Sequence, residues 1–170
     1  MRIQNAAASF LWLLLFFGEH LVPSQASGGS GERRGGGFSL GIRDSFMIAH
    51  SFHGHPSFGP AGGMHGATYT CDVEFCTSTL HPETNWVIDI GQASSILAKV
   101  LSKYNFQNLD ELFANSEMTT TEFMCKQIHQ DLCEELKKVG SSCDFAGSIC
   151  VKLWESHKAW ASYSNEVVVD

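Results

Sequence analysis

Four of the eight histidines in this chain lie close together in sequence, at His50, His53, His55 and His65. Imidazole nitrogens are common zinc ligands, and a catalytic zinc site takes three protein ligands and leaves a fourth position open. Each histidine taken singly is more often a surface residue or a satisfied core residue. The cluster therefore predicts a metal site provided that the fold brings enough of these imidazoles together.

Two of these histidines lie at the ends of predicted strands. Apolar residues of one parity run from Phe38 to His50, as a half-buried strand requires, so His50 ends this strand on its inner face. A second alternating run extends from His65 to Phe75, and His65 therefore faces inward as well. The Gly/Pro-rich residues between the two runs form a loop, which holds the other two histidines.

Two helices are expected after these strands. Asp89 is a predicted N-cap of a helix whose apolar stripe continues to Tyr104. Thr119 and Glu122 have the spacing of a capping box before a second helix, which Gly140 ends.

The stretches "CDFAGSICVKLWES" and "AWASYSNEVVV" indicate two further strands, joined by a tight turn around His157 and Lys158. The predicted element order is β β α α β β, which places the chain in the α+β class.

Composition favours one folded domain without nucleic acid partners. The chain has 170 residues, a hydrophobic fraction of 44%, a charged fraction of 17% and a formal net charge of −7. An acidic surface repels phosphate backbones and anionic lipid, so we expect binding neither to nucleic acid nor, once the targeting segment is removed, to membranes.

Residues 1–26 resemble a removable signal peptide, because Arg2 precedes an apolar run and the small residues Ser24 and Ala26 follow it at cleavage spacing. The alternative is a buried N-terminal helix. We expect a Gly/Ser-rich linker over 27–37, a domain over 38–165 and a tail over 166–170. This predicts the secretory pathway or an extracellular location, or alternatively an organelle such as a plastid reached by bipartite targeting.

Six cysteines follow the signal segment, namely Cys71, Cys76, Cys125, Cys133, Cys143 and Cys150. An even number in an oxidising compartment permits disulfides. Their positions in apolar strand and helix patterns are equally compatible with buried thiols.

Six short motifs occur in order along the chain: "FMIAH", "HGATY", "VIDI", "NFQNLDEL", "TTTE" and "WESHKAWASY". Together they resemble the 6-pyruvoyltetrahydropterin synthase and 6-carboxytetrahydropterin synthase family, and the resemblance covers nearly all of residues 38–163. It implies the tunnelling fold, with an antiparallel four-stranded sheet and two helices on one face. It also implies homo-oligomers that assemble around a barrel and form their sites between subunits.

The resemblance implies zinc as the cofactor. In the family, a histidine that ends the first strand and a His-x-His pair that opens the second bind zinc; His50 and His65 match, but Ala67 occupies the third place. His53 or His55 in the loop could replace the missing ligand.

The resemblance also implies a pterin-like ligand. A 2-amino-4-oxopteridine offers two parallel N–H donors, which one carboxylate can accept together, and Glu155 matches the family carboxylate. Thr120 and Thr121, beside Glu122, match the segment that holds the pterin. The alternatives are an exposed strand glutamate and plain helix capping.

The family's proton-transfer residues are not matched. The loop "SFGPAGGM" lacks the family cysteine, and Asn105 and Phe106 stand where the family has an Asp-His pair. Asp110 and Glu111 lie close by in sequence and could substitute, although exposed acids at a helix start are the alternative.

These observations predict a protein similar to 6-pyruvoyltetrahydropterin synthase that binds zinc and binds or acts on a pterin, with metal-assisted lyase chemistry on the pterin side chain. One alternative is a non-catalytic module that binds a pterin or a purine-like heterocycle. Another is a disulfide-stabilised secreted structural protein.

Overall fold

The computed structural model describes residues 37–115, 117–140 and 145–167. The expected signal segment, residues 27–36 of the expected linker and residues 168–170 of the expected tail lie outside these ranges. The described residues belong to one compact unit that spans 34–170.

A five-stranded sheet forms the centre of this unit, with the strand order β3-β1-β2-β4-β5. The four long strands are antiparallel: β1 is Phe38–His50, β2 His65–Thr77, β4 Gly147–Trp154 and β5 Trp160–Val167. The two-residue strand β3, Gln107–Asn108, runs parallel to the end of β1.

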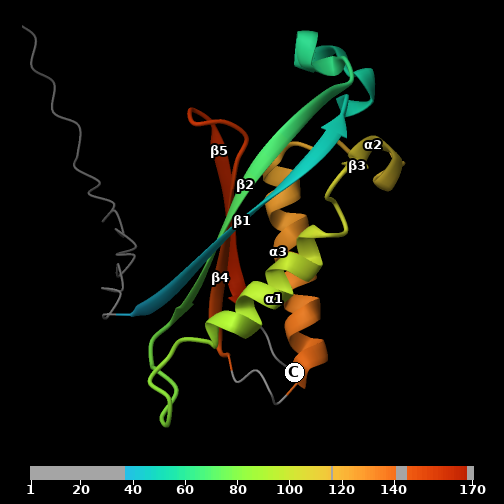
Figure 1. Cartoon of the computed structure of the whole chain (residues 1–170). Coiled ribbons are helices and arrows are strands. Elements are labelled where there is room, and N and C mark those ends of the chain that lie inside the picture. Colours follow the sequence, from blue (N-terminus) through green and yellow to red (C-terminus); the bar gives the residue numbers. More distant parts are fainter. Residues whose placement is uncertain (1–36, 116, 141–144, 168–170) are drawn as a thin grey trace, which may run out of the picture. The chain divides into compact units, whose positions relative to one another are not determined.

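Helices α1, Ile90–Leu101, and α3, Thr121–Val139, both lie on one face of the sheet (Figure 1). The β1–β2 connection forms two 3-10 turns, η1 at Phe52–Gly54 and η2 at Pro56–Gly62. No helix within the described ranges is long and apolar enough to cross a membrane.

The predicted order β β α α β β is confirmed, with two short additions between α1 and α3. These are β3 and the single-turn helix α2, Leu109–Leu112, whose N-cap Asn108 accepts a hydrogen bond from the Asp110 amide at 3.1 Å. Elements of two and four residues are too short to show a hydrophobic period, so the sequence pattern does not predict them.

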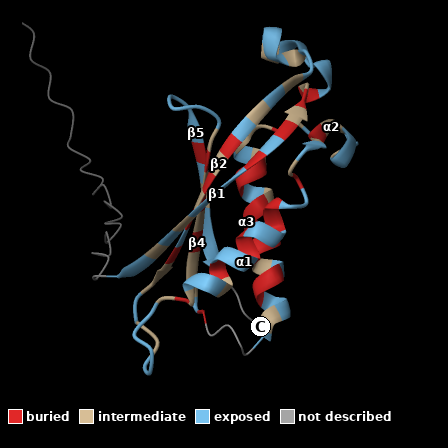
Figure 2. Ribbon diagram, viewed as in Figure 1, coloured by how far each residue is buried: buried red, intermediate tan, exposed pale blue. Residues whose placement is uncertain are grey.

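The core lies between the sheet and the two long helices, and Figure 2 shows buried residues along α3 and the strands that it covers. The predicted inner face of β2 is confirmed, because Tyr69, Cys71, Val73 and Phe75 are all fully buried. Burying one large apolar side chain contributes about 1.5–3 kcal/mol, so this face stabilises the unit strongly.

The four thiols of Cys71, Cys125, Cys133 and Cys150 form no disulfide within the part of the chain that the structure describes. Burial raises the pKa of Cys71 and of Cys125, the latter to about 11. Thiols in such surroundings stay protonated and behave as small apolar side chains.

The helix caps agree with the sequence at one helix and differ at the other. Asp89 caps α1, because its Oδ1 accepts a hydrogen bond from the Gln92 amide at 2.7 Å. The predicted cap Thr119 is wrong: Thr120 caps α3, and its hydroxyl accepts from the Phe123 amide at 3.3 Å. Thr119 is instead fully buried one residue earlier.

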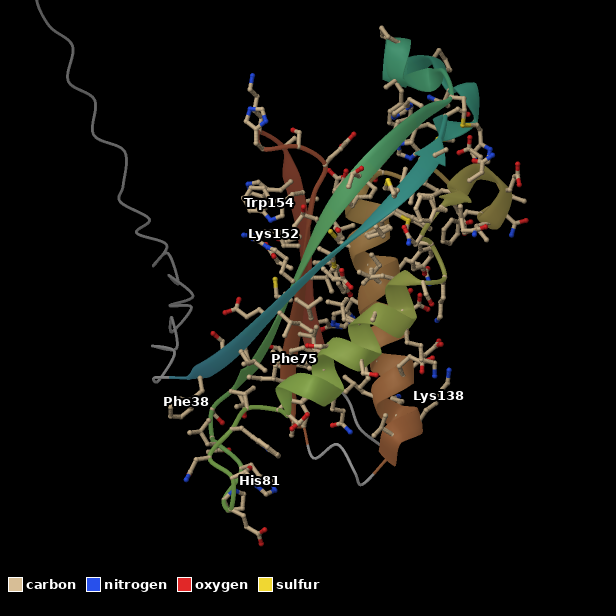
Figure 3. The ribbon with its side chains drawn as sticks, viewed as in Figure 1. Phe38, Phe75, His81, Lys138, Lys152 and Trp154 are labelled. Atoms are coloured by element: carbon tan, nitrogen blue, oxygen red, sulfur yellow. The ribbon has the colours of Figure 1, made fainter. Side chains whose placement is uncertain are left out.

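The face of the sheet opposite the helices carries a polar and aromatic cluster, and Figure 3 shows Lys152 and Trp154 pointing away from the helices. Asp72 accepts two hydrogen bonds from Arg43, at 2.5 and 2.9 Å, and one from the Trp154 indole at 2.7 Å. The Lys152 ammonium lies 4.4 Å from the ring centroid of Trp160. A cavity of about 380 Å³ lies beside this cluster, but both oxygens of Asp72 already have partners.

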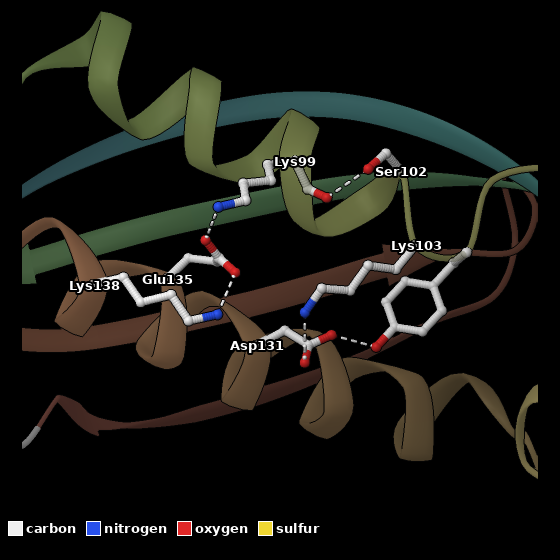
Figure 4. Close-up of polar contacts among 7 residues, drawn as sticks. Lys99, Ser102, Lys103, Asp131, Glu135 and Lys138 are labelled. Carbon is white, nitrogen blue, oxygen red and sulfur yellow. Dashed lines mark hydrogen bonds and ion pairs between the residues drawn. The ribbon is translucent and has the colours of Figure 1, made fainter.

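Two carboxylates of α3, Asp131 and Glu135, are buried where α3 packs against α1 (Figure 4). Each of their four oxygens has a partner. These partners are Lys99 at 2.5 Å and Lys138 at 2.8 Å for Glu135, and Lys103 at 3.1 Å and the hydroxyl of Tyr104 for Asp131. We refer to these six residues as the helix network.

Candidate functional site

The predicted site residues converge at one end of the sheet, where β1 finishes and β2 begins. Figure 1 shows that η1, η2, α2 and the turn between β4 and β5 all lie at this end. We call it the histidine end, because His50 and His65 are directly opposed there in the β1–β2 register.

The imidazole rings of His50 and His65 have their centroids 4.5 Å apart and are tilted by 54° relative to each other. His50 is fully buried, and its Nδ1 lies 3.2 Å from the carbonyl oxygen and 3.1 Å from the hydroxyl of Thr119. A carbonyl oxygen only accepts hydrogen bonds, so this contact assigns the proton to Nδ1 and leaves the lone pair on Nε2. That Nε2 atom is buried without a hydrogen-bond partner among the described residues.

The half-buried His65 has the same arrangement, because its Nδ1 lies 2.9 Å from the carbonyl oxygen of Gly63. Burial, followed by the neighbouring His65, lowers the pKa of His50, so His50 is neutral at pH 7. Imidazoles whose Nδ1 atoms donate to backbone oxygens have Nε2 available, which is how zinc ligands are commonly oriented.

The two loop histidines do not join this pair. His53 is exposed with a left-handed φ of 51°, and His55 caps η2 by accepting a hydrogen bond from the Ser57 amide at 3.3 Å. Within residues 37–115, 117–140 and 145–167, no group of three His, Cys, Asp or Glu side chains could hold a metal ion. These residues therefore supply two prepared imidazoles but do not fit a three-histidine zinc site within one chain.

An aromatic stack that the sequence did not predict supports the turn after His50. The ring of Phe52 lies 4.3 Å from that of His50 and stacks on Phe58 at 4.1 Å. Phe52 itself has a φ of 48°, and a left-handed conformation costs a bulky residue about 1–3 kcal/mol. Packing in this stack offsets that strain and keeps the start of the loop beside His50.

Glu155 follows β4 directly and begins the turn to β5, where its amide donates to the Ala159 carbonyl at 3.2 Å. Its exposed carboxylate accepts a hydrogen bond from the Thr121 hydroxyl at 3.0 Å. The structure thus joins Glu155 to Thr121, whereas Thr120 caps α3 and Glu122 is exposed in the first turn of that helix.

Tyr69 is a polar core residue that the sequence analysis did not single out. It is fully buried on the inner face of β2, and its hydroxyl has no hydrogen-bond partner among the described residues. Burial raises its pKa to about 12; the nearby Thr121 hydroxyl lowers the pKa in part, and the charge of Glu155 adds to the rise. Strand alternation placed Tyr69 in the core but gave no signal about its hydroxyl.

Asp110 and Glu111 occupy different surroundings. Asp110 accepts hydrogen bonds from the amide of Ser51 at 2.8 Å and from its hydroxyl at 2.5 Å, directly after His50, while its other oxygen is buried without a partner among the described residues. Glu111 is exposed and accepts only from the Asn108 side chain, at 3.0 Å, among the contacts described. Of these two acids, only Asp110 therefore contacts the segment that follows His50.

Asn105 and Phe106 hold the edge of the sheet. The Asn105 side chain accepts from the Met47 amide at 3.0 Å, and the Phe106 amide donates to the Met47 carbonyl at 2.7 Å. The Phe106 side chain is 73% exposed, and its φ is 60°. These contacts tie the segment before β3 to β1 and present no general base.

Three buried side-chain atoms lack a hydrogen-bond partner within the described ranges: His50 Nε2, the Tyr69 hydroxyl and Asp110 Oδ1. The charges of Glu155 and Asp110 both act on His50, and that of Glu155 also acts on Tyr69, so these groups are neighbours. Buried polar atoms without partners are rare in folded proteins. Two acceptors and one donor are therefore left without partners among the described residues at this end of the sheet.

The arrangement of the sheet and helices is that of solved 6-pyruvoyl tetrahydropterin synthases. The Caenorhabditis elegans enzyme is 22% identical with a TM-score of 0.63, and the match covers 76% of this chain and 96% of that one. The Plasmodium falciparum enzyme is 15% identical with a TM-score of 0.59, over 77% of this chain and 99% of that one. The chain is therefore a tunnelling-fold protein, as expected.

The sequence profile described as 6-pyruvoyl tetrahydropterin synthase matches residues 39–166. A protein of Archaeoglobus fulgidus, named as a candidate 6-carboxy-5,6,7,8-tetrahydropterin synthase, is 30% identical over 96 residues, which are 56% of this chain and 76% of that protein. The chain belongs to the 6-pyruvoyl tetrahydropterin synthase family.

Proposed function

We propose that the histidine end binds a pterin, with Glu155 accepting the two parallel N–H groups of the 2-amino-4-oxo ring. The observation that supports this most directly is the position of Glu155. Its carboxylate accepts a hydrogen bond from Thr121, and its charge acts on His50 and on Tyr69, each of which has a buried atom without a partner among the described residues. A carboxylate that accepts two parallel N–H groups combines charge with geometric selectivity.

The proposal includes zinc held by the Nε2 atoms of His50 and His65. Its support is the tautomer that Thr119 and Gly63 impose on the two imidazoles. Bound zinc would act as a Lewis acid toward a substrate oxygen. A third ligand has to come from outside this pair, either from a loop histidine that leaves its present place or from the bound molecule.

If the chain is an enzyme, Asp110 is the group of this chain placed to move a proton beside the ligand. Ser51 holds one of its oxygens and leaves the other unpartnered among the described residues. A carboxylate takes part in catalysis in the similar Plasmodium vivax 6-pyruvoyltetrahydropterin synthase, which was solved as a variant with a catalytic glutamate replaced by alanine.

A second candidate function is binding without turnover. It is favoured by Asn105 and Phe106, which hold the edge of β1 where the family resemblance places an Asp-His pair. The β1–β2 loop also contains no cysteine. In this version Glu155 binds the heterocycle, and the family's proton-transfer groups are absent.

We also propose that the chain works as a homo-oligomer. Glu155 is exposed, and β5 forms one edge of the sheet, while β3 pairs with only two residues of β1 at the other. Unpaired strand edges are surfaces on which a second copy can extend the sheet and close the site. Light scattering of the purified chain would measure the mass.

Calorimetric titration tests the binding proposal. Neopterin should bind, and the matching lumazine, in which an oxo group replaces the 2-amino group, should bind at least tenfold more weakly. Glu155→Gln should weaken neopterin binding at least tenfold, because removing one charged partner of such a pair costs about 2–5 kcal/mol. Glu111→Gln is the matched control and should bind as the wild type does. Equal affinities of the wild type and Glu155→Gln would refute the role of Glu155.

A further inference from the structure

Two tyrosines pack against the same phenylalanine in the core, and they differ in whether the hydroxyl group has a hydrogen-bond partner. The ring centroids of Tyr69 and Tyr104 lie 5.4 and 6.3 Å from that of Phe46. The Tyr104 hydroxyl donates to Asp131 in the helix network, whereas the Tyr69 hydroxyl has no partner among the described residues. A buried hydroxyl without a partner destabilises the fold, so its retention needs another reason.

The surroundings of Tyr69 show what kind of partner is missing. Thr121 is a polar neighbour that lowers the pKa of Tyr69, but no hydrogen bond joins the two hydroxyls among the described residues, and the Thr121 hydroxyl donates to Glu155. The phenol stays protonated at pH 7, because burial raises its pKa to about 12. Tyr69 therefore offers a fixed donor beside Glu155 and lacks an acceptor.

We infer that Tyr69 is a ligand-binding residue, whose hydroxyl donates a hydrogen bond to the oxo group next to the two N–H groups that Glu155 accepts. This inference rests on the proposed pterin site and adds a second point of recognition to it. The edge of a 2-amino-4-oxo ring presents donor, donor and acceptor in sequence. Glu155 accepts hydrogen bonds from the two donors, and Tyr69 donates one to the acceptor. The pair selects heterocycles that carry this edge, whatever their side chain.

The test compares Tyr69→Phe with Tyr104→Phe in the purified chain, by thermal unfolding without ligand and by calorimetric titration with neopterin. Tyr69→Phe removes an unpaired hydroxyl, so it should raise the unfolding temperature by roughly 2–8 °C and weaken neopterin binding about tenfold. Tyr104→Phe removes a paired hydroxyl, so it should lower the unfolding temperature and leave the affinity within about twofold. A purely structural tyrosine does not combine higher stability with weaker binding.

The outcomes separate this inference from the proposed function. If the wild type binds neopterin, Glu155→Gln loses affinity and Tyr69→Phe does not, the Tyr69 inference is overturned while the pterin site stands. A lower unfolding temperature for Tyr69→Phe would also overturn it, because the hydroxyl would then have a partner in the free protein. If the wild type binds no neopterin, the proposed function and the inference fall together.

Discussion

The helix network and the histidine end both bury polar side chains, but they treat them in opposite ways. In the helix network, every carboxylate oxygen of Asp131 and Glu135 contacts a lysine or a tyrosine (Figure 4). At the histidine end, one atom each of His50, Tyr69 and Asp110 is buried without a partner among the described residues. The same kind of residue therefore serves the scaffold where it is satisfied, and indicates a site where it is not.

The contrast extends to backbone conformation. The two helices of the network have no residue with positive φ, whereas Phe52 and His53, in the turn that follows His50, are both left-handed. Strained residues persist only where the surrounding structure holds them, and they gather at functional sites. Within the described ranges, the histidine end therefore differs from the two helices in backbone strain as well as in its unpartnered atoms.

The contrast between the helix network and the histidine end would fail if the histidine end were a complete catalytic site of the family type. We predict little or no formation of 6-pyruvoyltetrahydropterin from dihydroneopterin triphosphate, measured by product identification. Losing the proton-transfer group of such a reaction removes roughly 10²- to 10⁴-fold in rate. Efficient, zinc-dependent turnover would contradict this prediction. Loss of that turnover in Asp110→Asn, but not in Glu111→Gln, would then identify Asp110 as the group that took over.

A second prediction sharpens the account of the His50 and His65 imidazoles. His50→Ala and His65→Ala should each strip bound zinc from the purified chain, because each removes one of two prepared Nε2 ligands. Elemental analysis after dialysis measures the content, and His157→Ala, in the turn between β4 and β5, is the control that should keep it. Metal content that is unchanged in both variants would remove these histidines from any zinc site.

The smallest expected effect concerns the satisfied region. Hydrogen bonds from Lys138 and then Lys99 lower the pKa of Glu135 from 4.5 to about 2. A carboxyl group with a lower pKa in the folded state stabilises the fold at neutral pH and loses that contribution as pH falls. The difference in unfolding free energy between the wild type and Glu135→Gln should therefore be constant above about pH 5 and shrink from there toward pH 2. A difference that does not change with pH would show that Glu135 is not held as an ion.

Local patterns predicted most of the fold. Alternation alone identified the inner faces of β1 and β2, and Asp89 was a correct cap because its hydrogen bond joins residues three apart. The cap of α3 was misplaced by one residue, because three consecutive threonines satisfy the same local rule. What distinguishes Thr119 is its contact with His50, which lies 69 residues away in sequence.

For the candidate site, the sequence predicted only what residue types and family motifs can indicate. The motifs singled out His50, His65, Glu155 and Thr121, and their roles in a site stay a prediction. Nothing in the sequence indicated that the Tyr69 hydroxyl would be unpaired, since alternation cannot distinguish a tyrosine that only packs from one that also binds. Whether a polar atom has a hydrogen-bond partner depends on which residues surround it in the folded chain, and these often come from segments that are distant in sequence.

The crystal structure of the purified chain with neopterin is the most direct test of the central claim, that the unpartnered atoms of the histidine end face a heterocycle. The account predicts electron density for the ring at this end, with its 2-amino edge against the carboxylate of Glu155 and its oxo group within hydrogen-bond distance of Tyr69. Density for neopterin elsewhere, for example in the cavity beside Lys152 on the face opposite the helices, with the histidine end unchanged, would contradict it.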